Sequence, residues 1–290
     1  MQTSIERLTR DLAEQGYIAD SSLATALALM DTLERPLLVE GEAGVGKTAM
    51  AAALAASREA KLIRLQCYEG IDVSSALYEW DYPRQLLAMQ ALVHRGEGDT
   101  GELYSEKYLQ ERPLLQAIRQ PKSPVLLIDE IDRADEAFEA FLLEVLSEFT
   151  VSIPEIGTIS AITRPSVILT SNDTRELSDA LRRRCLYHYC DYPTFERELE
   201  ILRLTLPDVD EQLLTQVTGF VQRIRDWDVS RRPGIAESID WARALAGFGV
   251  ENLEDSGSVV NDTVSCLLKT PEDLQVFSEQ GEELLASLNG

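Results

Sequence analysis

One stretch decides the fold, the eight residues Gly41-Glu42-Ala43-Gly44-Val45-Gly46-Lys47-Thr48. They match the phosphate-binding pattern G-x-x-x-x-G-K-[ST], the P-loop or Walker A motif. The apolar run 36–40 predicts a strand before the loop, and the alanine-rich segment 49–57 predicts a helix after it. Glycines let such a loop turn its backbone N–H groups toward a phosphate, and the helix N-terminus adds a favourable dipole. We therefore expect these residues to bind the phosphates of a nucleotide.

The amino-acid composition limits the kinds of partner that we expect this protein to bind. The 290 residues include 27 basic and 50 acidic ones, which gives a formal net charge of −23. Because so acidic a surface repels nucleic acid and anionic lipid, we expect neither as a partner. The first 20 residues show no secretion signal and no apolar run is long enough to cross a bilayer, so the sequence predicts a cytoplasmic protein without a membrane span. Four scattered cysteines predict reduced thiols.

A second motif ends in two carboxylates, at Pro124-Val-Leu-Leu-Ile-Asp129-Glu130. Four consecutive apolar residues predict a parallel strand buried on both faces, whose carboxyl end reaches the ligand crevice. This is a Walker B pattern. We expect Asp129 and Thr48 to hold Mg²⁺, and Glu130 to act on the attacking water as general base.

Two polar features follow further along the chain. The apolar run 166–171 predicts a strand that ends at Asn172, whose amide would orient the hydrolytic water or cap the next turn. The segment 176–184 predicts a short helix that ends in Arg182-Arg183-Arg184. A guanidinium there would stabilise transition-state charge on a neighbouring subunit's nucleotide, while pairing with the helix dipole is the simpler alternative.

Domain organisation follows from the pattern of elements. Strands and helices alternate up to residue 193, and only helices are predicted afterwards, so we expect an α/β nucleotide-binding domain at 1–193 and a smaller helical domain at 194–290. Aromatic residues scattered among charges at 68–111 predict an insertion, either a partner-contacting surface or pore element or a satellite core. Residues 150–161 predict a hairpin, and the polar stretch 249–261 predicts a loop.

Taken in this order, the motifs resemble those of an AAA+ ATPase, over nearly the whole chain. That resemblance implies a five-stranded parallel sheet flanked by helices and followed by a smaller all-helical lid. More narrowly, the chain looks like the MoxR family, nearest its CoxD-like branch. The segments that carry this likeness are Gly16-Tyr17-Ile18, Arg64-Leu-Gln-Cys-Tyr-Glu-Gly70, Leu77-Tyr-Glu-Trp-Asp-Tyr-Pro-Arg84, Asp129-Glu-Ile-Asp-Arg-Ala134 and Glu237-Ser-Ile-Asp-Trp-Ala-Arg-Ala244.

The family likeness implies an ATP- and Mg²⁺-dependent hexameric ring with a chaperone-like role in activating another enzyme or inserting its metal. Relatives commonly work with a protein that bears a von Willebrand factor A domain. The CoxD-like branch is associated with molybdenum hydroxylases of the carbon monoxide dehydrogenase type.

The likeness also assigns roles to residues. Lys47, Thr48, Asp129, Glu130 and Asn172 fall on the family's nucleotide motifs. Counting back from the last strand favours Arg184 as the arginine finger, with Arg183 second. Tyr17 or Ile18 would line the adenine, with core packing as the alternative. The lid arginine of many AAA+ proteins has no clean counterpart, and Arg232 is the candidate.

Other functions remain as alternatives. A nucleotide-gated assembly scaffold would bind ATP with little turnover, although Glu130 and Asn172 argue for hydrolysis. A DNA-directed AAA+ protein is disfavoured by the charge of −23. A small P-loop kinase would not need the helical domain, and a GTPase would need an Asn-Lys-x-Asp motif, which is absent.

Overall fold

The computed structural model describes residues 2–95 and 101–286. Residues 96–100 of the predicted insertion and 287–290 of the predicted lid lie outside the described residues. The chain forms two compact units, and each is described by itself. The first comprises Met1–Leu8, Ser21–Glu40 and Ala51–Tyr189, and the second comprises Thr9–Asp20, Gly41–Met50 and Cys190–Gly290.

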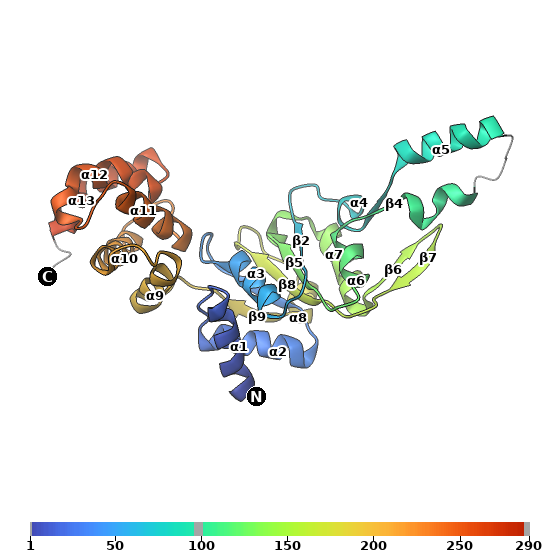
Figure 1. The fold of residues 1–290 in the computed structure, drawn as a ribbon, viewed down its shortest axis with the longest axis horizontal. Helices are drawn as coiled ribbons and strands as arrows, with labels where there is room; N and C mark the ends of the chain where they lie inside the picture. The colour runs from blue at the N-terminus through green and yellow to red at the C-terminus, as the bar shows by residue number, and fades with distance from the viewer. Residues whose placement is uncertain (1, 96–100, 287–290) are drawn as a thin grey trace. The chain divides into compact units, whose positions relative to one another are not determined.

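A parallel sheet of five strands forms the centre of the first unit (Figure 1). Its order is β2-β5-β8-β1-β9, from β1 (Leu37–Glu40), β2 (Leu62–Gln66), β5 (Val125–Asp129), β8 (Ser166–Ser171) and β9 (Leu186–Tyr189). Every residue of β1 and β5 is buried, as expected for central strands covered on both faces. In register, Leu37 pairs with Ile168 on one side and with Leu186 on the other. The predicted five-stranded parallel sheet is confirmed.

Helices cover this sheet. α2 (Ser21–Leu33) contacts β1 and β9, and α6 (Pro113–Ile118) contacts β2 and β5. A short 3₁₀ turn, η3 (Ile131–Arg133), separates β5 from α7 (Glu136–Glu148), and α8 (Asp179–Arg184) precedes β9. Two helices have residues in both units, α1 (Gln2–Glu14) and α3 (Lys47–Ser57).

The insertion contributes residues to the core and also has exposed apolar residues, and its contact with a partner stays a prediction. It contains α4 (Val73–Ala76), β3 (Tyr78–Trp80), α5 (Tyr82–Arg95), η1 (Gly101–Tyr104), η2 (Glu106–Tyr108) and β4 (Leu109–Glu111), with β3 and β4 antiparallel. Trp80 and Tyr108 are buried in the same core as the strand β5, whereas Tyr82, Leu86 and Leu87 on α5 are exposed.

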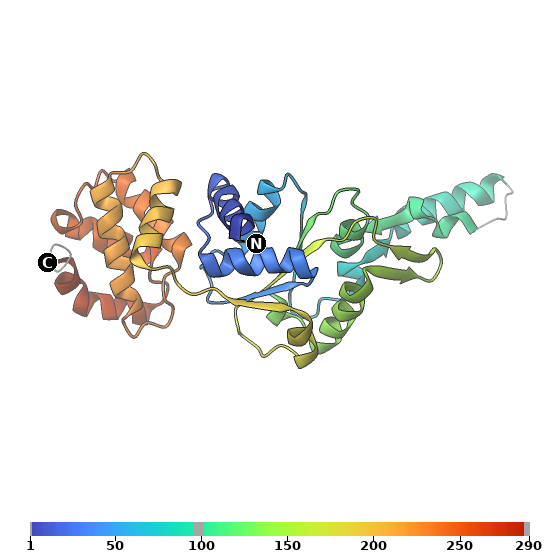
Figure 2. The same cartoon turned by 90° about the horizontal axis from the view of Figure 1, so that it is seen from below.

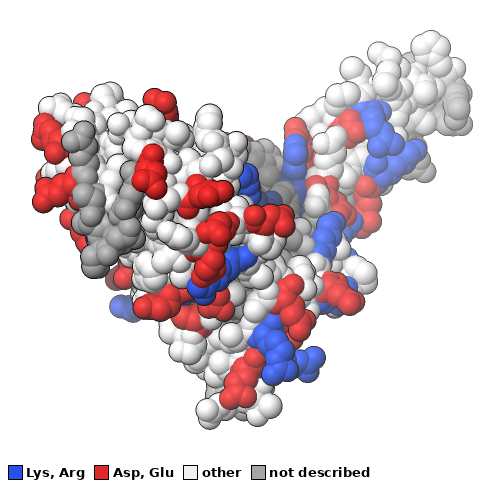
Figure 3. Space-filling model, turned by 60° about the vertical axis from the view of Figure 1, so that its left-hand side comes forward, with Lys and Arg blue, Asp and Glu red and all other residues white. Residues whose placement is uncertain are grey.

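Two protrusions leave the first unit from the same end of its sheet. One is α5, and the other is the antiparallel hairpin of β6 (Thr150–Ile153) and β7 (Gly157–Ser160), as Figures 1 and 2 show. In Figure 3 the extension at the upper right, which holds α5, is mostly free of charged side chains, in contrast to the acidic surface elsewhere in the view.

The helices of the second unit form a bundle (Figure 2). They are α9 (Phe195–Thr205), α10 (Glu211–Arg225), α11 (Ile235–Gly247), η4 (Glu254–Ser256), α12 (Gly257–Thr263), η5 (Val264–Cys266) and α13 (Pro271–Ala286). Phe220 packs between Trp241 and Phe277, at ring-centroid distances of 4.7 and 6.1 Å. The predicted helical lid is confirmed, and the predicted loop at 249–261 is wrong at its end, because α12 begins at Gly257 and buries Val260.

Within the described ranges, no helix is both long and apolar enough to cross a membrane.

Candidate functional site

The P-loop, in the second unit, has a conformation that requires glycine. Gly44 lies in the left-handed region with φ +80°, and a Cβ at Gly41 would lie 2.1 Å from the carbonyl oxygen of Cys190. Lys47 donates hydrogen bonds from Nζ to the carbonyl oxygens of Gly41 (2.6 Å) and Glu42 (2.7 Å). The loop therefore has the shape of a phosphate cradle, with its ammonium group bound to its own backbone.

The other loop side chains differ in exposure. Val45 is buried, whereas the side chains of Glu42, Ala43 and Thr48 are exposed, and Thr48 lies in the first turn of α3. Thr48 is therefore an exposed residue at the helix N-terminus, where anions bind favourably.

The start of α11 lies directly against the P-loop. The N–H group of Ile235 donates to the carbonyl oxygen of Gly44 (3.0 Å), and a Cβ at Gly234 would lie only 2.7 Å from the Cα of Gly44. Glu237 accepts a hydrogen bond from the N–H group of Gly234 (3.1 Å), which fixes this helix start. Arg232, an exposed residue just before this contact, is therefore in the segment that approaches the loop, and its nucleotide contact stays a prediction.

The segment that contains Tyr17 and Ile18 also lies beside the P-loop. A ring carbon of Tyr17 is 3.6 Å from where a Cβ of Gly46 would be, and burial raises the pKa of Tyr17 above its ordinary value. Arg197, from α9, donates to the carbonyl oxygen of Ile18 (2.9 and 3.2 Å) and pairs with Asp20 (2.7 Å). The segment is thus fixed near the phosphate loop, and its contact with adenine stays a prediction.

In the first unit, Asp129 ends β5 as a buried and fully engaged carboxylate. Arg64, on the neighbouring strand β2, donates from Nε to Oδ2 (2.9 Å) and forms an ion pair with the same oxygen through Nη2 (2.5 Å), and the hydroxyl group of Thr170 donates to Oδ1. Burial, together with the negative charge of Asp129, raises the pKa of the nearby Cys67 to about 12, so this thiol stays protonated. The carboxylate of Asp129 is oriented from both sides and already accommodates a positive charge.

Glu130 leaves the strand in an unusual conformation. Its φ of 55° places it in the left-handed region, which costs a non-glycine residue roughly 1 kcal/mol. Its N–H group donates to the hydroxyl oxygen of Thr170 (3.0 Å), and its side chain is 39% exposed, with Oε2 at 3.8 Å from Nε of Arg133. Strain of this kind is typical of functional positions. The half-exposed carboxylate can reach a water molecule, as a general base must.

Asn172 follows β8, which is the neighbour of β5 in the sheet. Asn172 and the Walker B carboxylates Asp129 and Glu130 therefore lie at the carboxyl ends of adjacent strands. Its N–H group donates to Oδ2 of the buried Asp132 (3.3 Å), which also accepts from the N–H (3.1 Å) and hydroxyl (2.6 Å) groups of Thr174. Asp132 thus fixes the loop that carries Asn172. The sequence analysis did not assign this role to Asp132, which lies three residues after Asp129 in the same motif segment.

The structure separates the three arginines of α8. Arg182 pairs with the buried Glu40 at the end of β1 (3.0 Å). Arg183 and Arg184 are exposed, and neither guanidinium forms an ion pair with another residue of the described ranges. The two predicted finger residues are therefore both exposed, whereas Arg182 is 37% exposed and forms an ion pair with Glu40.

Comparisons with known proteins agree with this geometry. The model of the family described as "ATPase family associated with various cellular activities (AAA)" matches residues 37–190. The chain is 25% identical over 201 residues to the gas vesicle ATPase GvpN of Haloferax mediterranei, which covers 66% of this chain and 57% of that protein. A solved structure of an ATPase candidate from Cytophaga hutchinsonii aligns with a TM-score of 0.51 at 15% identity, over 96% of this chain and 85% of that one, and shows likeness of fold alone.

Proposed function

This chain belongs to the AAA family of ATPases, and from that premise we propose that it binds ATP with Mg²⁺ and hydrolyses it. The observation that carries the proposal is the pair of carboxylates at the end of β5. Asp129 is buried and fixed by hydrogen bonds, and the next residue, Glu130, is strained and half-exposed. One carboxylate suits a metal and the other suits a water molecule.

Each group would have a distinct task. The P-loop N–H groups and Lys47 would bind the phosphates, and Thr48 and Asp129 would hold Mg²⁺, which prefers oxygen ligands and neutralises phosphate charge. Asn172 would orient the attacking water, and a carboxylate oxygen of Glu130 would accept its proton. The pairing of Asp129 with a guanidinium supports the fit, because the site already stabilises positive charge beside this carboxylate.

The exposed arginines support a ring. Arg184, with Arg183 as second candidate, would stabilise transition-state charge at the nucleotide of the next subunit, an effect worth roughly 10³ to 10⁵ in rate for arginine fingers. A closed ring repeats this contact at every interface, and we propose a hexamer. Tyr17 or Ile18 would contact the adenine, and Arg232 would approach the nucleotide from the lid.

We further propose a cytoplasmic chaperone role, in which hydrolysis remodels a client metalloenzyme such as a molybdenum hydroxylase, together with a von Willebrand factor A domain protein. The sequence segments that resemble the MoxR family support this role. The exposed apolar residues of α5 support it as well, because contact with another protein would cover Tyr82, Leu86 and Leu87.

Two substitutions test hydrolysis. We expect Glu130→Gln to bind ATP normally while turnover falls about 10²- to 10⁴-fold, because only the general base is lost. Lys47→Ala should instead lose ATP binding. The matched control is Glu136→Gln, an exposed glutamate at the start of α7, which should leave both quantities unchanged. Fluorescent-nucleotide titration and phosphate release measure them, and wild-type turnover by Glu130→Gln would contradict the proposal.

The client role has its own test. A molybdenum hydroxylase co-expressed with the wild-type chain should become active, and Glu130→Gln should fail to activate it. If Glu130→Gln activates the client as well as the wild type does, the chain is a nucleotide-gated scaffold.

A further inference from the structure

We propose that Arg35 is a positioning residue that fixes the arginine-bearing end of α8, and thereby holds Arg183 and Arg184 for the neighbouring subunit's site. This inference rests on the role proposed above for those arginines. It adds a residue that neither the motifs nor the family match assigns to the reaction.

Arg35 binds three consecutive carbonyl groups at the end of α8. Its Nη2 donates to the carbonyl oxygens of Arg183 (2.7 Å) and Cys185 (3.0 Å), and its Nε donates to that of Arg184 (3.2 Å). The last helical hydrogen bond of α8 runs from the N–H group of Cys185 to Leu181, so these carbonyl groups lie beyond the helical ladder. A planar guanidinium can satisfy all three at once, which an ammonium group cannot do with the same geometry.

The backbone on both sides of Arg35 is itself fixed. Glu34 adopts the left-handed conformation (φ 51°), and the N–H group of Arg35 donates to the carbonyl oxygen of Met30 (3.3 Å), which closes the C-terminal turn of α2. Pro36 then restricts Arg35 to an extended conformation. The carbonyl oxygen of Pro36 accepts a hydrogen bond from the N–H group of Leu186 (2.7 Å). The backbone next to Arg35 is therefore fixed to the start of β9, the strand at this edge of the sheet.

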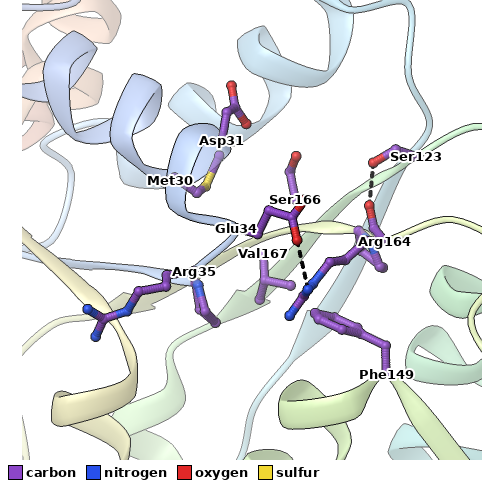
Figure 4. A pocket seen from close by; sticks show the side chains of 11 residues that line it. Met30, Asp31, Glu34, Arg35, Ser123, Phe149, Arg164, Ser166 and Val167 are labelled. Atoms are coloured by element: carbon purple, nitrogen blue, oxygen red, sulfur yellow. Dashed lines mark hydrogen bonds and ion pairs between the residues drawn. The ribbon is translucent and has the colours of Figure 1, made fainter.

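In Figure 4 the guanidinium group of Arg35 points in a different direction from the other charged side chains nearby. Arg35 points away from the pair formed by Glu34 and Arg164, which lies across the same pocket (2.8 Å). Arg164 is therefore a matched control, because it lines the same pocket, forms an ion pair and, within the described ranges, has no hydrogen bond or ion pair with α8.

α8 is thus fixed at two places, by a contact with β1 and by a contact with the turn that precedes β1. Arg182, on α8, pairs with Glu40 at the carboxyl end of β1. Arg35, which lies just before the amino end of β1, binds the last carbonyl groups of α8. Because Arg183 and Arg184 follow Arg182 directly, their side chains project from a backbone held at both sides. A displacement of about 1 Å at a reacting group can cost about 10²-fold in rate, so such a support affects catalysis.

The test compares Arg35→Ala, Arg35→Lys and Arg164→Ala. We expect Arg35→Ala to lower kcat about 10- to 100-fold with little change in KM, because phosphate binding does not involve α8. Arg35→Lys should give an intermediate kcat, and Arg164→Ala should match the wild type. Combining Arg35→Ala with Arg184→Ala should cost no more than Arg184→Ala alone, since both act through one group.

Mixing subunits separates positioning from general damage. Arg35→Ala subunits keep Glu130, so Glu130→Gln subunits with intact arginines should restore turnover when the two are mixed. A kcat of Arg35→Ala equal to wild type, or a loss that mixing does not restore, would overturn the inference. If Arg184→Ala and Arg183→Ala both hydrolyse ATP normally, the shared site fails first and the inference fails with it. If Arg184→Ala is inactive while Arg35→Ala is fully active, only the role of Arg35 is refuted.

Discussion

The two units each contain a buried carboxylate paired with an arginine, and they differ in the arginine. In the helical unit, Glu198 and Arg225 have side-chain exposures of 0% and 6%, with contacts of 2.6 and 2.7 Å and a further hydrogen bond from Ser238. In the sheet unit, Asp129 is equally buried at 4%, but the side chain of Arg64 is 50% exposed.

This difference agrees with a structural role for Glu198 and with the metal-binding role that we propose for Asp129. Glu198 is enclosed together with its partner, so no ligand can replace Arg225. Asp129 keeps its orientation through Thr170, while its cationic partner lies partly in water and can give way to another cation. Glu198 and Asp129 are buried to a similar extent, so the exposure of the arginine is what distinguishes these two pairs.

The largest effect is expected at Arg225. Replacing it with alanine leaves Glu198 buried without its counter-charge and removes the hydrogen bond to the carbonyl oxygen of Pro233 (2.7 Å). Loss of one partner of a buried pair costs about 3–5 kcal/mol, so we expect Arg225→Ala to unfold much of the helical unit. Urea denaturation followed by circular dichroism measures this.

The control for this prediction is Arg203→Ala, which removes an arginine that pairs with Glu211 on the surface. It should leave the denaturation midpoint unchanged, because solvent screens an exposed pair. Equal losses for Arg225→Ala and Arg203→Ala would break the comparison.

A smaller effect is expected at Arg64. Because half of its side chain lies in water, we expect Arg64→Ala to lower the free energy of unfolding by about 1 kcal/mol without ligand. Mg²⁺ with ATP should restore the stability, since a cation at Asp129 replaces the lost charge. Thermal melts with and without Mg²⁺·ATP measure both, with Arg64→Lys as the charge-preserving control. A loss as large as that of Arg225→Ala would show that Arg64 is structural.

Local sequence patterns predicted the fold and the strand ends at which the candidate site residues lie, because strands that are buried on both faces appear as continuous apolar runs. The run that ends in Asp129 and Glu130 is β5, and the glycine-rich loop follows β1. The helical lid was predictable from a different local pattern, the helical spacing of apolar residues after residue 193.

What the sequence could not show depends on contacts between distant segments. Three adjacent arginines look equivalent in the sequence, and only the contact with Glu40, 142 residues away, sets Arg182 apart. The targets of Arg35 lie about as far along the chain, at Arg183 to Cys185, and nothing in its neighbourhood indicates them. Some aromatic residues of the insertion are buried and others are exposed. Their spacing in the sequence is irregular and does not indicate which ones are buried.

The central claim is that hydrolysis occurs at a site shared between subunits. The most direct measurement is ATP turnover by a one-to-one mixture of Arg184→Ala and Glu130→Gln subunits, each inactive alone, with light scattering to confirm mixed assembly. If each site needs Glu130 from one subunit and Arg184 from the next, random mixing completes about a quarter of the sites and restores about a quarter of wild-type activity. A mixed assembly that stays inactive, or full turnover by a variant that lacks both Arg183 and Arg184, would contradict the account.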